Sequence, residues 1–255
     1  MTTNQKIKDL ILSNLDTILD TNHKNLPTAK KPHINETIIV FDGVVNENKF
    51  HSNGILFLLK EAVEKSIEDN HKDKIINIDK DIRSFDLIRT AYEEAKQQSS
   101  ETYTGELHWK ELCEWVYAFK HPDHSFLNVI NHGRYLNEIS IVNIKKVAGQ
   151  STTDMKIMNT IVNNDKYKNL LKEEINLLLP RIVICCGTFE QAKILYGVNE
   201  TTLKLNSGVD YFKHQNILFV NFIHPTQYGA AQKPSMKYAY AKEVFGELSR
   251  RINLL

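Results

Sequence analysis

Side chains suited to acid–base or electrostatic catalysis follow three apolar runs of this sequence. Lys60 and Glu61 come directly after the first of these runs. Asn143 lies at the end of the second, and His224 follows the third. Ligands of open α/β sheets bind outside the carboxyl ends of the strands, so we expect these side chains to meet at one edge of a sheet. A carboxylate, an amide and an imidazole equip that edge for catalysis on a polar substrate.

Each of these residues also has an explanation without catalysis. Glu61 is suited to the first turn of a helix, where a carboxylate meets the positive end of the dipole. Asn143 is suited to a turn closed by its own side chain. His224 precedes Pro225 and is also typical of a plain loop. These alternatives stay open at the level of the sequence.

The elements that must position these residues alternate between apolar runs and helical spacing. Runs apolar on both faces are typical of strands covered on both sides, and the alternation predicts a mainly parallel sheet. Right-handed crossovers place helices on both faces, so the predicted fold is a three-layer α/β/α sandwich around a central, mainly parallel four-stranded sheet. The four sheet strands are 54–59, 138–144, 181–186 and 216–223; a further strand is 37–41; the helices are 5–20, 83–98, 106–119, 154–178, 189–196 and 234–253, with 61–137 mostly helical. Thr188 is the expected N-cap of helix 189–196.

Length and composition indicate one globular domain over residues 1–255, with 1–35 as an N-terminal helical extension and connector. No apolar run approaches the roughly 20 residues that a membrane-spanning helix needs. The first residues lack the unbroken apolar core of a signal peptide. The chain has 3 cysteines, two of them adjacent, which favours a reducing compartment. We therefore expect a cytoplasmic protein without a membrane partner.

The charge is balanced overall but unevenly distributed. The net charge is +1, whereas residues 201–255 hold 7 Lys+Arg against 3 Asp+Glu. A basic C-terminal face is one way to meet an anionic polymer, and an ordinary solvated surface is the other.

Other candidate residues carry weaker signals. Three histidines lack a recognised metal-ligand spacing, two cysteines sit in an apolar run typical of a core, and three aromatic residues are typical of a buried helix face rather than a base-stacking platform. No glycine-rich nucleotide loop is present, so no metal and no organic cofactor is expected. These weaker candidates are His121, His124, His132, Cys185, Cys186, Trp109, Trp115 and Tyr117.

The order of these parts resembles the uracil-DNA glycosylase superfamily, from about residue 37 to residue 248. An acid follows the first buried strand, an Asn stands in Ile-Val-Asn-Ile-Lys-Lys (141–146), and the last strand ends in Phe-Ile-His-Pro-Thr (222–226). The last segment is similar to the family's His-Pro-Ser loop. The first motif departs: Leu-Lys-Glu-Ala-Val (59–63) stands where the family usually has Gly, a polar residue, an acid or Asn, and Pro. The resemblance implies an α/β/α sandwich that removes a base from DNA.

The resemblance also implies roles for the strand-end residues. Glu61 positions water or stabilises the oxocarbenium-like sugar, and Asn143 hydrogen-bonds the edge of the flipped base. His224 donates a hydrogen bond to the departing base as negative charge develops there. Lys60 lies at the base site, and amine attack with a Schiff base and strand nicking is its less favoured second role.

Five further positions are implied to shape the pocket and the DNA surface. Val63 stands where many members of the family have a Tyr that blocks 5-substituted pyrimidines, which indicates a roomier pocket. The segment after His224 is expected to lie against the duplex. Its expected DNA-binding residues are Thr226, Gln227, Tyr228 and Lys233.

Together these features predict a monofunctional, monomeric DNA glycosylase that acts on a 5-modified pyrimidine. A group of similar phage-defence glycosylases removes glucosylated cytosines, so glucosylated hydroxymethylcytosine in phage DNA is one expected substrate. The first alternative is a uracil-DNA glycosylase of base excision repair. The others are a catalytically inactive DNA-binding module on the same fold and an unrelated α/β hydrolase or transferase for a small polar substrate.

Overall fold

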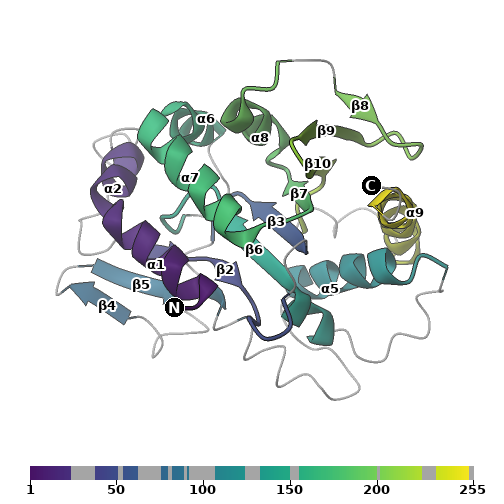
Figure 1. The fold of residues 1–255 in the computed structure, drawn as a ribbon, viewed down its shortest axis with the longest axis horizontal. Coiled ribbons are helices and arrows are strands. Elements are labelled where there is room, and N and C mark those ends of the chain that lie inside the picture. The colour runs from purple at the N-terminus through teal and green to yellow at the C-terminus, as the bar shows by residue number, and fades with distance from the viewer. Residues whose placement is uncertain are drawn as a thin grey trace.

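The computed structural model places the predicted strands at the centre of the molecule. The strands β3 (Ile55–Leu59), β6 (Ile139–Asn143), β7 (Ile182–Cys186) and β10 (Ile217–Phe222) are parallel and lie in the order β6-β3-β7-β10 (Figure 1). Every residue of β3, β6 and β7 is buried, because side chains on both faces of these strands pack against helices. The four predicted sheet strands are confirmed. The structure describes residues 1–23, 38–50, 54–62, 76–79, 82–88, 91, 107–123, 133–149, 155–199, 202–225 and 234–252.

The central sheet is larger and more mixed than the sequence predicts. Among the described residues it has seven strands, since β2 (Gly43–Val44) pairs antiparallel with β6, and β9 (Asp210–His214) and β8 (Leu203–Lys204) extend it antiparallel beyond β10. The prediction of four strands is therefore corrected. The added strands are short or polar and lie towards the edges of the sheet, so their sequences lack the continuous apolar run of a central strand.

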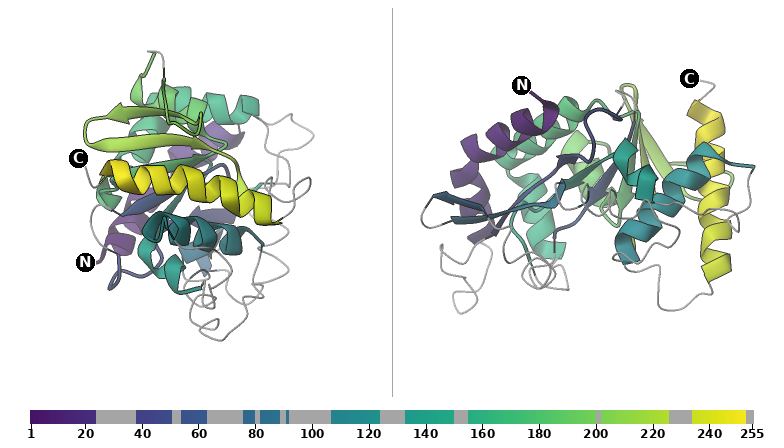
Figure 2. Two further views of the ribbon diagram at one scale, coloured as in Figure 1. Left: turned by 90° about the vertical axis from the view of Figure 1, so that its right-hand side faces the viewer. Right: turned by 90° about the horizontal axis from the view of Figure 1, so that it is seen from below.

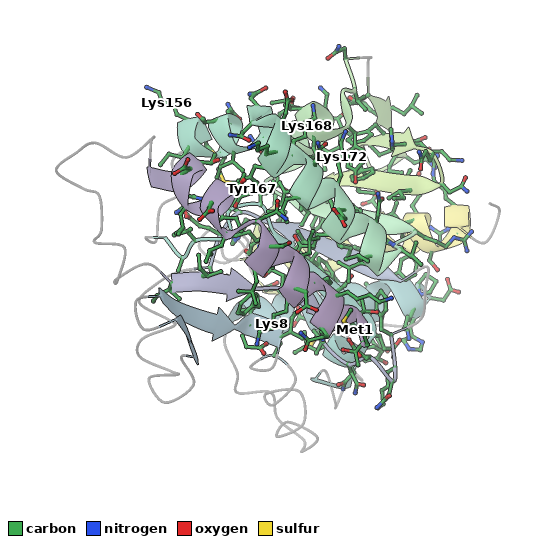
Figure 3. The ribbon with its side chains drawn as sticks, turned by 60° about the vertical axis from the view of Figure 1, so that its left-hand side comes forward. Met1, Lys8, Lys156, Tyr167, Lys168 and Lys172 are labelled. Atoms are coloured by element: carbon green, nitrogen blue, oxygen red, sulfur yellow. The ribbon has the colours of Figure 1, made fainter. Side chains whose placement is uncertain are left out.

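Helices cover both faces of the central sheet. One face carries α5 (Leu107–Lys120) and α9 (Pro234–Ile252). The other carries α1 (Thr3–Ser13), α2 (Leu15–His23), α6 (Met155–Asn163), α7 (Asp165–Leu178) and α8 (Phe189–Tyr196). The right-hand view of Figure 2 shows the strands between the two groups of helices. Helix α1 lies alongside α7 (Figures 1 and 3).

The two faces form two apolar cores. Trp115 of α5 packs against Phe222 and Phe245 with ring centroids 4.8 and 5.9 Å away. On the other face, Ile7 and Ile11 of α1 are fully buried with the apolar residues of α7. The strands alternate between the two cores, as the period of two of a β-strand requires.

A second, smaller sheet lies beside the central one. It has the order β1-β5-β4, with β1 (Ile38–Phe41) parallel to β5 (Ile82–Asp86) and β5 antiparallel to β4 (Ile76–Asp79). The strand predicted at 37–41 is therefore confirmed. The helix predicted at 83–98 is wrong over residues 83–86, because pairing with β1 and β4 places them in a strand. Pairing with neighbouring strands outweighs the local helix propensity of this segment.

Two predicted helices are each divided by an asparagine. Helix 5–20 is observed as α1 and α2, separated at Asn14. Helix 154–178 is observed as α6 and α7, and the side chain of Asn164 between them accepts a hydrogen bond from the Tyr167 N–H at 3.1 Å. Asparagine is suited to these junctions because its short side chain caps free backbone groups.

The helix termini complete the comparison. Thr188 occupies the N-cap position of α8, as predicted, but its side chain forms no capping hydrogen bond. Its hydroxyl donates instead to the Leu58 carbonyl at 2.8 Å. Helices 106–119, 189–196 and 234–253 are confirmed as α5, α8 and α9. A short 3-10 helix, η5 (Gly133–Glu138), precedes β6. No helix within the described ranges combines the length and apolarity needed to cross a membrane.

Candidate functional site

The backbone ladder between β3 and β6 continues beyond the two strands. The Ile144 N–H donates to the Leu59 carbonyl at 3.0 Å, and the Lys145 N–H donates to the Lys60 carbonyl at 2.9 Å. Further along, the Gly149 N–H donates to the Ala62 carbonyl at 2.9 Å. These bonds hold the segment that carries Lys60 and Glu61 beside the segment that follows Asn143.

Glu61 forms an ion pair at this edge of the sheet. Lys145 Nζ donates to Glu61 Oε2, and the two side chains are only 13% and 4% exposed, respectively. The carboxylate also lies against the Cα of Gly149, where a Cβ would overlap it. Glu61 is thus a held, nearly buried carboxylate at the carboxyl end of β3.

Lys60 extends the other way, towards β7 and β10. Gly187, at φ +68°, follows β7, and a Cβ placed on it would lie 3.0 Å from Lys60 Cε and 3.8 Å from His224 Cβ. Glycine is needed here twice, for the positive φ and for the space taken by the lysine stem. Lys60 and His224 therefore share one corner of the strand-end edge.

His224 is held in its neutral form. Burial, and then the charge of Lys60, lower the pKa of His224 from 6.5 to about 4. A neutral imidazole offers one N–H donor and one nitrogen acceptor at pH 7. In the part of the chain that the structure describes, Lys60 has no carboxylate within ion-pair distance, whereas Lys145 has Glu61.

Asn143 lies in a separate, buried cluster. Its backbone N–H donates to Asp42 Oδ2 at 2.7 Å and its amide nitrogen donates to Asp42 Oδ1 at 2.8 Å. Because a carboxylate only accepts, these bonds set the orientation of the amide, with the amide oxygen turned away from Asp42. That oxygen is buried and has no hydrogen-bond partner among the described residues.

The centre of this cluster is a fully buried lysine. Lys146 Nζ contacts Asp42 Oδ2, and lies 2.8 Å from Glu174 Oε1 on α7. Burial lowers the pKa of Lys146, but the two carboxylates outweigh it and the net shift is upward. Burial, and then the charge of Asp42, raise the pKa of Glu174 to about 7 against the opposing effect of Lys146. The Lys146 N–H donates to the Tyr167 hydroxyl at 2.8 Å, so β1, α7 and the segment after β6 meet at this lysine.

The structure brings together Lys60 and His224, pairs Glu61 with Lys145, and places Asn143 in the buried cluster. Four residues of these groups were not among the predicted site residues. Lys145 and Lys146 carried a signal in the sequence because they follow Asn143 at a strand end, and Asp42 because it follows the apolar run 37–41. Glu174 has no such signal, since it lies within a helix. The predicted positions Val63, Thr226, Gln227, Tyr228 and Lys233 lie outside the described residues.

The weaker candidates are mostly core residues. Trp115 and Tyr117 are buried, as predicted. Cys185 and Cys186 are fully buried, and burial raises the pKa of both thiols, which disfavours a nucleophilic thiolate. His121 Nε2 lies 3.1 Å from the Tyr135 hydroxyl. His124, His132 and the side chain of Trp109 lie outside the described residues.

A cavity of about 310 Å³ borders the buried cluster at Asp42. It lies between the first turns of α1 and the ends of β1 and β5. Asp42 and Asp86 line it, with Lys8 opposite the ring of Phe41. Asp42 is therefore shared between this cavity and the cluster around Lys146.

No protein-family model matches this chain, and no curated protein shows significant similarity to it.

Proposed function

We propose that the protein is a DNA glycosylase that hydrolyses the N-glycosidic bond of a flipped base. The observation that carries the proposal is the pair of opposite charges at one strand-end edge. Glu61 provides a held carboxylate on the β6 side, and Lys60 with the neutral His224 provides a cation and an N–H donor on the β7 and β10 side.

The chemistry of base release needs this polarity. As the bond breaks, positive charge develops on the sugar and negative charge on the departing base. A fixed carboxylate stabilises the first and prearranged donors stabilise the second, without reorganisation during the reaction. The target base must first leave the stack, at a cost of a few kcal/mol. Placement of this edge at the carboxyl ends of parallel strands in a three-layer sandwich supports the same proposal.

The proposed substrate is a 5-modified pyrimidine, with glucosylated hydroxymethylcytosine of phage DNA as the first candidate. The support is the sequence after Glu61, where Val63 stands at the position of the Tyr that blocks 5-substituted pyrimidines in many members of the uracil-DNA glycosylase superfamily. The reaction is proposed to stop at the abasic site, without a metal or organic cofactor, and with the protein acting as a monomer.

Base release from a panel of DNAs tests this proposal. Unmodified DNA, uracil-containing DNA and phage DNA with glucosylated hydroxymethylcytosine are incubated with the wild type and with Glu61→Gln. Abasic sites are counted with and without alkali. We expect sites only in the phage DNA, cleaved only after alkali, and far fewer with Glu61→Gln.

The remaining outcomes separate the alternatives. Release of uracil alone assigns the protein to base excision repair. DNA binding without base release, unchanged in Glu61→Gln, indicates an inactive binding module. If the protein neither binds DNA nor releases a base, the result points to an enzyme for a small polar substrate. The cavity beside Asp42 and Asp86 favours that alternative.

A further inference from the structure

Glu61 is held more tightly than a surface carboxylate. Its side chain is 4% exposed, its Oε2 accepts from Lys145 Nζ, and its carboxyl group occupies the space that a side chain at position 149 would need. By contrast, the Glu190–Lys193 pair on α8 joins atoms 3.3 Å apart, and Glu190 is 70% exposed. Exposed pairs of this kind contribute little, whereas removal of one member of a desolvated pair leaves the other charge uncompensated.

The backbone explains why Lys145 reaches Glu61. The Lys145 N–H is bonded to the Lys60 carbonyl and the Gly149 N–H to the Ala62 carbonyl, so the chain brackets Glu61 on both sides. Lys60, the neighbouring cation, extends instead to Gly187 and His224. Lys145 is therefore the cation that pairs with the Glu61 carboxylate, and Lys60 is the cation that lies beside His224.

We propose that Lys145 is a positioning residue that holds the Glu61 carboxylate in place for catalysis, and that Gly149 provides the niche in which the carboxylate lies. This inference rests on the proposed function and adds to it two residues that do not touch the substrate. The sequence alone places Lys145 near a strand end but gives it no role.

The central test is a double-mutant cycle in base release. Lys145→Met lowers kcat about tenfold or more with little change in KM, because the carboxylate loses its fixed position and its counter-charge. The same substitution in the Glu61→Gln background has no further effect, since Lys145 acts only through Glu61. Lys145→Arg restores most of the activity, and Lys193→Met, which removes the cation of the exposed pair, matches the wild type.

Rescue by the conservative variant and the split between kcat and KM separate positioning from a general structural role. A general loss of structure would affect Lys145→Arg as well, whereas a positioning role is restored by the arginine cation. Gly149→Ala lowers kcat by a similar factor, and the loss does not multiply with that of Lys145→Met.

Two results overturn the inference. One is an equal loss of kcat from Lys145→Met in the wild type and in Glu61→Gln, without rescue by Lys145→Arg. The other is a set of additive changes in Tm, which are measured if the wild type releases no base and the proposed function has therefore failed. Non-additive changes in Tm for Lys145→Met and Glu61→Gln then support the Lys145–Glu61 coupling, and additive changes reject it.

Discussion

His224 differs from an ordinary surface histidine in its charge state. It is partly buried beside Lys60, and it remains neutral throughout the physiological range because both effects disfavour the imidazolium. A neutral ring is suited to donate one N–H to a base that acquires negative charge, and it does so without losing a proton. The value of this residue to the proposed reaction depends on its neighbours rather than on its identity alone.

Replacement of His224 by alanine is expected to lower kcat for base release by about 10²–10⁴-fold, since a positioned donor is lost from the transition state. Single-turnover release from the phage DNA measures the effect. The circular dichroism spectrum and Tm should stay close to those of the wild type. A rate within a few-fold of the wild type would remove His224 from the site.

Lys60→Met is expected to raise the pKa of His224 from about 4 part of the way towards 6.5. Only the charge of Lys60 is removed and the burial remains, so the return is incomplete. An NMR titration of the imidazole carbon signals checks this. Lys145→Met is the matched control and leaves the His224 titration unchanged, because its side chain pairs with Glu61.

Lys146 joins three elements in the interior of the molecule. Asp42 follows β1, Glu174 belongs to α7, and Lys146 follows β6, with all three side chains fully buried in the ion pairs. Such a cluster is weak evidence for stability as a whole, but removal of one member leaves the others uncompensated. The cluster also holds Asn143 through Asp42, which links the interior to the end of β6.

Lys146→Met is expected to lower the free energy of unfolding by about 3–5 kcal/mol, because two buried carboxylates lose their cation. Urea denaturation followed by circular dichroism measures the change. Lys193→Met, in an exposed pair, should shift the free energy by less than about 0.5 kcal/mol. A small effect at Lys146 would mean that the carboxylates are protonated or solvated in the folded state.

The raised pKa of Glu174 gives stability a characteristic dependence on pH. The folded state binds a proton at this carboxyl more readily than the unfolded state, whose value is 4.5. The contribution is therefore complete below about pH 4.5 and is lost as the pH rises through about 7. Glu174→Gln should remove this loss.

Urea midpoints of the wild type and of Glu174→Gln, measured between pH 4.5 and 8, provide the test. The difference between the two curves is the informative quantity, because His224 affects both proteins equally. The lowered pKa of His224 makes the stability of both proteins rise with pH between about pH 4 and 6.5, which is opposite to the effect of Glu174. Parallel curves over the whole range would show that the pKa of Glu174 is the same in the folded and unfolded states.

The molecule as a whole is nearly neutral, so any attraction to DNA must come from a local surface. The net charge is +1, while residues 201–255 carry 7 basic and 3 acidic residues. Figure 3 shows Lys156, Lys168 and Lys172 on the helices of one side, together with Lys8 of α1. Acidic residues lie on the same helices as Lys8, Lys168 and Lys172, namely Asp9 on α1 and Asp165 and Glu173 on α7, so this side does not form a single basic field.

Affinity for DNA is expected to fall with salt by at least about tenfold between about 50 and 200 mM, because phosphate contacts release counterions. Filter binding with a non-cleavable duplex over a salt series measures the slope. A bound state independent of salt, or no binding at all, would favour the reading as an enzyme for a small polar substrate.

Much of the architecture was readable from local pattern. The runs 54–59, 138–144, 181–186 and 216–223 became adjacent parallel strands, because segments apolar on both faces must be covered on both sides. The hydrophobic pattern did not predict the strands that form only because a neighbouring strand pairs with them. Residues 83–86 form part of β5 only because β1 and β4 lie beside them, and β8 and β9 form because β10 offers an edge.

The candidate site shows the same division. From the sequence alone, the strand-end rule predicted that Lys60, Glu61, Asn143 and His224 meet at one edge of the sheet, since it depends only on where apolar runs end. The structure places Lys60 beside His224, whereas the Asn143 side chain lies in the buried cluster. Only the tertiary structure decided their partners: Lys145 and Gly149 for Glu61, Gly187 for Lys60, and Asp42 for Asn143. The physical reason is that strand ends follow from local hydrophobic pattern, whereas ion pairs and shared charge depend on contacts between residues far apart in the chain.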